Sequence, residues 1–167
     1  SHFPSADWFD YSNVKAKCQA LGGRFAVCSG TPGDLDFING ISRARGMEEV
    51  MMDLVTDNEV YLAIMEARFQ FYYEMQERIL QAADGLIDIM HTGEDFGNQR
   101  GPMISMKVFD KHFAPKLKQY FAMVHGHGAS TMMHMCGCCE AFLNKFKNIV
   151  ILFSETIRMI SIGCNSF

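Results

Sequence analysis

Four short apolar runs recur along the chain, and they constrain its fold more than any other feature. They are Gly23–Gly30, Leu86–His91, Ser130–Met135 and Asn148–Phe153. None shows the strict alternation of polar and apolar residues that marks a strand with one solvent-facing side. Runs of this kind are typical of parallel strands that are covered on both faces. We therefore predict four strands, separated by helical segments, in a parallel α/β fold.

Helical patterns fill the intervals between these runs. After the first run, a glycine-broken loop and a short helix lead into a predicted helix over 47–54. The longest predicted helix spans about 58–83. Its expected buried face steps by three and four residues through Val60, Ile64, Ala67, Phe71, Met75 and Ile79. A helix over about 106–125 should be kinked at Pro115, and a short helix should cover 139–146.

Two architectures accommodate this order of elements: a small doubly wound sheet, or part of a (β/α)8 TIM barrel. A complete barrel needs about 250 residues, so the 167 residues present could supply about half of one. We expect a single partial barrel domain over residues 1–167, with its helices on one face of the sheet. Such a half-barrel would expose its other face and two strand edges, and we therefore expect a homodimer or a partner chain.

Charge and composition disfavour several classes of function. The formal net charge is −4, whereas binding of nucleic acid requires a basic face. No apolar run approaches the roughly 18–20 residues that cross a bilayer. The 6 cysteines and 13 methionines suit a reducing compartment, so we expect a cytoplasmic protein.

Polar residues with metal-binding chemistry follow two of the predicted strands. His91 ends the second strand, with Glu94 and Asp95 just beyond it, and His134 and Cys136 end the third. Active sites of parallel α/β folds gather at the carboxyl ends of the strands. In an extended segment, residues two apart point to the same side, so an imidazole and a thiolate could bind one zinc ion there.

Each of these residues also has a simpler interpretation. His134 could be a hydrogen-bonded histidine and Cys136 a small buried apolar side chain. Glu94 and Asp95 could belong to a solvated turn rather than contact a substrate. Cys138 and Cys139 do not form the C-x-x-C of redox proteins or zinc knuckles, and a structural role is the simpler interpretation for them.

The order of these motifs resembles the uroporphyrinogen decarboxylase superfamily, and most closely its corrinoid-dependent methyltransferases. Members carry a loop like DDxGxQxGPxIS, a helix like xxFxxxxxPxxK and a strand that ends in HxCG. The corresponding segments here are Asp95–Ser105, Phe109–Lys116 and His134–Gly137. The resemblance covers roughly residues 5–146.

The resemblance implies a (β/α)8 barrel in which His134 and Cys136 bind zinc, with a third ligand from a cysteine much later in the chain. In that branch, zinc holds a small substrate thiol as its thiolate, and the thiolate takes a methyl group from a methyl-corrinoid on a partner protein. Asp95 corresponds to a pocket-lining position. The alternatives are uroporphyrinogen decarboxylase itself, a metal-free lyase of porphyrin biosynthesis, and a non-catalytic remnant. The HxCG ending favours the methyltransferase.

The sequence departs from the family pattern after Phe146. Residues 147–167 form an atypical tail, KNIVILFSETIRMISIGCNSF, in place of the family's continuation. Cys164 does not match the spacing of the late zinc ligand. We therefore expect that the chain is a fragment of a barrel, or a product truncated or frame-shifted near residue 147.

Overall fold

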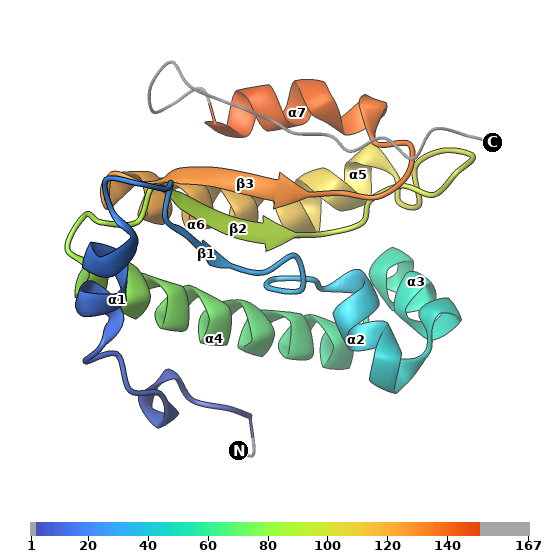
Figure 1. Ribbon diagram of the computed structural model, residues 1–167. Helices are drawn as coiled ribbons and strands as arrows, with labels where there is room; N and C mark the ends of the chain where they lie inside the picture. Colours follow the sequence, from blue (N-terminus) through green and yellow to red (C-terminus); the bar gives the residue numbers. More distant parts are fainter. Residues whose placement is uncertain (1–2, 151–167) are drawn as a thin grey trace.

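A three-stranded parallel sheet lies at the centre of the computed structural model, which describes residues 3–150. Its strands β1 (Cys28–Gly30), β2 (Ile89–Gly93) and β3 (Ser130–His134) lie side by side in chain order (Figure 1). The structure thus confirms the predicted class of fold, a parallel α/β sheet with helices. Three of the four predicted strands are present, although β1 is much shorter than the run that predicted it.

The register of the strands brings their carboxyl ends together. Gly30 of β1 pairs with His91 of β2, and Gly93 of β2 pairs with His134 of β3. The segments that leave β2 and β3 therefore begin at the same level. Side chains near the start of these two segments are therefore placed close to one another.

Helices occupy most of the remaining chain. After a 3-10 turn at Ala6–Trp8, the order is α1 (Val14–Leu21), α2 (Ile38–Arg45), α3 (Met47–Thr56), α4 (Glu59–Ala83), α5 (Met106–Val108), a π-helix (Phe109–Phe113), α6 (Ala114–Gly126) and α7 (Glu140–Val150). Figure 1 shows α6 behind the sheet, with α4 below it and α7 above it. The helix α6 contacts both α4 and α7, so these three form one layer.

The two faces of the sheet have different surroundings. Met90 and Thr92 of β2 are fully buried, whereas Ile89 and His91 are only half-buried. Thr131 of β3 contacts His125 of α6 through a 3.2 Å hydrogen bond. Since side chains alternate along a strand, Met90, Thr92 and Thr131 point toward the helix layer. His91 and His134 therefore point toward the opposite face.

The buried face of α4 differs from the predicted one. It is shifted by one residue at its start and comprises Tyr61, Met65, Phe69, Gln76, Leu80 and Ala83, while Val60 is 60% exposed. Apolar residues lie almost all round this helix, so periodicity alone cannot choose between adjacent stripes. Tertiary hydrogen bonds favour the observed face, because the buried Gln76 amide donates to Asp34 at 2.6 Å. The Tyr61 hydroxyl likewise donates to the Phe37 carbonyl at 3.4 Å.

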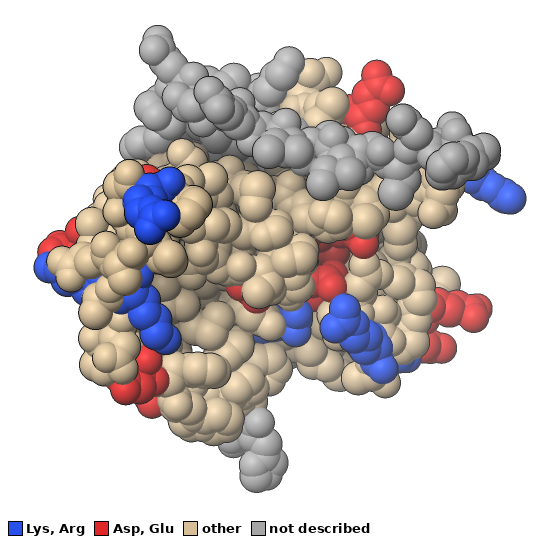
Figure 2. Space-filling model, in the orientation of Figure 1, with Lys and Arg blue, Asp and Glu red and all other residues tan. Residues whose placement is uncertain are grey.

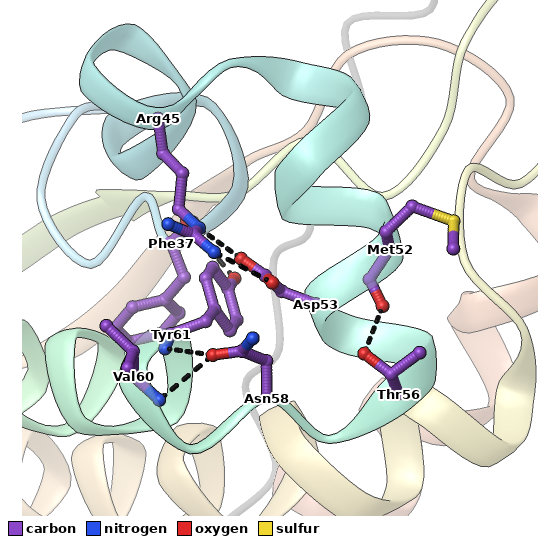
Figure 3. Close-up of polar contacts among 8 residues, drawn as sticks. All are labelled: Phe37, Arg45, Met52, Asp53, Thr56, Asn58, Val60 and Tyr61. Carbon is purple, nitrogen blue, oxygen red and sulfur yellow. Dashed lines mark hydrogen bonds and ion pairs between the residues drawn. The ribbon is translucent and has the colours of Figure 1, made fainter.

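A compact corner of α2, α3 and α4 supports the loop after β1 (Figure 3). Asp53 accepts hydrogen bonds from the Arg45 guanidinium, one of them at 3.0 Å. Asn58 caps α4, since its side-chain oxygen accepts from the backbone N–H groups of Val60 and Tyr61 at 3.0 and 3.3 Å. The Arg45–Asp53 contact joins α2 to α3, beside the carboxyl ends of the strands (Figure 1).

The helix predicted over 106–125 is irregular where a kink was expected. A π-helical turn at Phe109–Phe113 separates α5 from α6, and Pro115 occupies the first turn of α6. Proline has no backbone N–H and cannot donate to the preceding turn. The chain accommodates it with the wider π-helical turn.

A cluster of phenylalanines anchors the loop that follows β2. The ring of Phe96 lies 5.1 Å from the rings of Phe109 and Phe113 and 5.2 Å from that of Phe142, measured between centroids. All four rings are fully buried. Because Phe96 directly follows Glu94 and Asp95, this packing fixes the backbone that carries both acids.

The predicted fourth strand, Asn148–Phe153, is not found where the structure describes it. Asn148, Ile149 and Val150 belong to the last turn of α7, and residues 151–153 lie outside the described part of the chain, as does most of the predicted tail over 147–167. The prediction is wrong for residues 148–150, because a short apolar run is compatible with a helix as well as with a strand. Within residues 3–150, no helix combines the length and apolar character needed to cross a membrane.

Candidate metal centre

Asp95, His134 and Cys136 converge at the carboxyl ends of β2 and β3. His134 is the last residue of β3, and Cys136 lies two residues further along. Asp95 lies two residues beyond Gly93, the partner of His134 in the sheet. One potential ligand atom from each of the three lies within 4.8 Å of the others.

Short contacts link the three side chains. His134 Nε2 lies 3.1 Å from Cys136 Sγ and 3.9 Å from Asp95 Oδ1. The same Asp95 oxygen accepts a hydrogen bond of 2.7 Å from the Cys136 backbone N–H. The carboxylate therefore also fixes the segment that carries the thiol.

The three donors fit a zinc ion in both chemistry and spacing. Imidazole nitrogen, thiolate sulfur and carboxylate oxygen are all zinc ligands, with bonds of about 2.0–2.3 Å. A tetrahedral angle would place nitrogen about 3.5 Å from sulfur and about 3.4 Å from oxygen. The observed separations of 3.1 and 3.9 Å differ from these by about half an ångström. His134 and Cys136 lie at the strand end, as predicted, and their metal binding remains a prediction.

Glycines allow the two ligand-bearing loops to approach closely. Gly137 adopts a φ of 75°, a left-handed conformation that favours glycine. A Cβ added there would lie only 2.6 Å from backbone atoms of Gly97. The Cys138 N–H donates to the Asn98 carbonyl at 2.8 Å, so the loop after β3 is hydrogen-bonded to the loop after β2. Cys138 itself is exposed and Cys139 is buried.

Glu94 occupies a structural position that its sequence context did not reveal. Its carboxylate accepts from the backbone N–H of Phe37 at 2.7 Å and from that of Ile38 at 3.3 Å. These N–H groups begin α2 and have no partner within the helix. Burial, followed by the nearby negative charge of Asp36, raises the pKa of Glu94 well above its usual 4.5. Glu94 therefore joins the loop after β2 to the start of α2.

His91 is half-buried and lies on the same face of the sheet as His134. Burial, and then the neighbouring His134, lower the pKa of His91 below its ordinary value. This residue lies within β2, two residues before Gly93, and is not part of the trio. Its expected contact with a substrate remains a prediction.

A polar pocket of about 190 Å³ opens beside the trio. It is lined by Pro32, Gly33, Asp36, Asn39, Arg43, Glu94, Asp95 and His134. On the face shown in Figure 2, acidic and basic side chains lie together near the carboxyl ends of the strands, beside α2. Sequence reasoning placed Glu94, Asp95 and His134 near one another but missed the contribution of α2.

Asn39 is the most informative of the missed residues. Its side-chain amide donates to Asp95 Oδ2 at 2.8 Å. The only sequence signal is its place in the first turn of a short helix that follows β1, a position that fold geometry directs toward the carboxyl ends of the strands. No family model, curated protein or solved structure matches this chain.

Proposed function

We propose that the protein belongs to the uroporphyrinogen decarboxylase superfamily and acts as a corrinoid-dependent methyltransferase. In this proposal, the sheet is part of a (β/α)8 barrel, and His134 and Cys136 bind zinc. The observation that carries the proposal is the convergence of His134, Cys136 and Asp95 where two adjacent parallel strands end. The strand order β1-β2-β3 also follows the chain, as it does in a barrel.

The donor set supports activation of a thiol. A zinc-bound thiol is deprotonated, which makes it nucleophilic at neutral pH. The chain's own residues would hold the ion through His134 and Cys136, and Asp95 would fix the Cys136 backbone through its hydrogen bond of 2.7 Å. The methyl donor in this proposal is a methyl-corrinoid carried by a partner protein, and the acceptor is a small thiol.

The size of the pocket supports a small acceptor. Pockets for drug-sized ligands span about 300–1,000 Å³, and this pocket measures about 190 Å³. A small thiol is compatible with that space. The HxCG ending at His134–Gly137 favours the methyltransferase over the tetrapyrrole decarboxylase.

Zinc content provides the first test. Wild-type protein loaded with zinc and then dialysed should retain the metal, whereas Cys136→Ser should lose it and keep the same thermal midpoint, because a half-buried thiol at a strand end contributes little packing. Cys138→Ser is the matched control and should retain zinc, since this exposed thiol is outside the trio. Equal zinc in the wild type and in Cys136→Ser would refute the proposed metal centre.

Methyl transfer provides the second test, with free methylcobalamin as donor and 2-mercaptoethanol as acceptor. Loss of the methyl group changes the visible spectrum of the corrinoid, and the rate should depend on zinc and on His134. A rate in His134→Ala or in zinc-free protein that equals the rate of zinc-loaded wild type would contradict the proposed methyl transfer. Zinc binding without any transfer would limit the proposal to the metal centre.

A further inference from the structure

We infer that Asp95 is a third protein ligand of the metal and that Asn39 is the positioning residue that orients it. This inference rests on the metal centre proposed above. It differs from the ligand set that the family resemblance implies, in which the third ligand is a cysteine. The donors here would be one nitrogen, one sulfur and one oxygen.

The two oxygens of Asp95 have separate roles. Oδ2 accepts from the Asn39 amide at 2.8 Å, which turns Oδ1 toward β3. Oδ1 accepts from the Cys136 N–H at 2.7 Å and lies 3.9 Å from His134 Nε2. A carboxylate oxygen has two lone pairs, so Oδ1 retains one that can bind the same ion as His134 and Cys136.

Hydrogen bonds donated by residues at the start of α2 to three acidic side chains hold Asn39 in place. The backbone N–H of Asn39 donates to Asp36 Oδ1 at 3.1 Å, and the N–H groups of Phe37 and Ile38 donate to Glu94. The loop after β2 thus accepts from the start of α2 through Glu94, and it accepts from Asn39 of α2 through Asp95. Both acids are bound to the same helix, so the orientation of Asp95 is set before any metal binds.

Three protein ligands would leave a tetrahedral ion with one further position. This is the arrangement of catalytic zinc sites, in which the fourth position takes water or substrate. Two of the three ligands, Asp95 and His134, also line the polar pocket. The substrate thiol would therefore reach the metal from the pocket.

Replacing Asp95 in two ways separates ligation from support of the backbone. Asp95→Asn keeps an oxygen that can accept the Cys136 N–H but lacks the carboxylate charge, and Asp95→Ala lacks both. Zinc affinity is measured by competition with a chromophoric chelator, and the ligand field by the absorption spectrum of bound Co²⁺. If Asp95 is a ligand, both variants should lose more than the roughly 10–100-fold in affinity that a supporting residue contributes, and the Co²⁺ spectrum should change in both. Wild-type affinity in Asp95→Asn together with a loss in Asp95→Ala would overturn the assignment.

Replacing Asn39 tests the positioning role. Asn39→Ala should lower zinc affinity roughly 10–100-fold while the Co²⁺ spectrum keeps its sulfur-to-metal band. The matched control is Asn13→Ala, an exposed asparagine before α1 whose side chain makes no capping hydrogen bond.

Affinities that are equal in Asn39→Ala and Asn13→Ala would overturn the positioning role. Thermal midpoints of all variants are recorded so that a loss of affinity is assigned to the site only in folded protein. The variant His134→Ala separates failure of the proposed metal centre from failure of the Asp95 and Asn39 assignments alone. If it binds zinc as tightly as wild type, the metal centre itself is refuted, whereas a loss in His134→Ala with none in the Asp95 and Asn39 variants refutes only this inference.

Discussion

Replacement of Gly137 by alanine should destabilise the protein and weaken its metal centre at the same time. Gly137 directly follows Cys136 and has a φ of 75°. An alanine there would carry a Cβ in the left-handed region, which costs roughly 1–2 kcal/mol. That Cβ would also lie 2.6 Å from the carbonyl carbon and oxygen of Gly97, closer than a Cβ approaches a heavy atom to which it is not bonded. The loop after β3 must therefore move away from the loop after β2, and Cys136 must move with it.

The other end of β3 supplies a matched control. Gly128 has a φ of 81°, so Gly128→Ala carries the same left-handed strain, but its Cβ would meet no atom within 4 Å. The difference between the two variants therefore isolates the steric contact. Overpacking of this kind costs roughly 1–3 kcal/mol. For a chain of this size, that difference corresponds to a thermal midpoint roughly 2–12 °C lower in Gly137→Ala than in Gly128→Ala.

Thermal unfolding followed by circular dichroism measures the first effect, and chelator competition for zinc measures the second. Gly128→Ala should bind zinc as wild type does, because Gly128 lies at the end of β3 remote from the trio. Gly137→Ala should bind it more weakly, since displacement of Cys136 separates its thiol from His134. Equal thermal midpoints in the two variants would show that the close approach of Gly97 and Gly137 does not constrain the loops, and the argument would be wrong.

The remaining predictions concern the supports of the same loop. Because the folded-state pKa of Glu94 is raised, this group favours folding most below its usual pKa of 4.5, and its contribution is lost as the pH rises through the raised value. In metal-free protein, Glu94→Gln should therefore show a smaller decline in the free energy of unfolding with rising pH than wild type, as measured by urea titration across a pH series above 4.5. A parallel decline in both proteins would show that Glu94 does not carry this dependence. Phe96→Ala should cost about 3–5 kcal/mol, because the fully buried ring fills a cluster of phenylalanines, whereas Phe25→Ala, at a side chain 64% exposed, should change stability by about 0.5 kcal/mol or less. Urea unfolding of both variants measures the difference, and a comparable loss in the two would contradict the assigned role of Phe96.

The sequence by itself determined the class of the fold and the end of the sheet at which the polar residues gather. Local patterns carry this information, because strand and helix periodicities depend on neighbours only a few residues apart. The spacing of His134 and Cys136 predicted a common direction for a strand that reached Cys136. Because β3 ends at His134, the loop after β3 and the hydrogen bond from Cys136 N–H to Asp95 place the thiol. Local patterns did not decide the structure of residues 148–150, because a few apolar residues suit the end of a helix as well as a strand.

Only the tertiary structure decided which residues complete the site. Asn39 and Asp95 are 56 positions apart in the chain, and Asp95 meets Cys136 across 41. No local pattern specifies such pairs, which depend on the register of β2 against β3 and on the path of α2 above them. The same reason explains why the contact of Glu94 with the start of α2 was missed. Its expected contact with a substrate remains a prediction. A carboxylate beside a strand end has the same sequence signature in either role, and the backbone N–H groups that it meets are set by a helix more than fifty residues earlier.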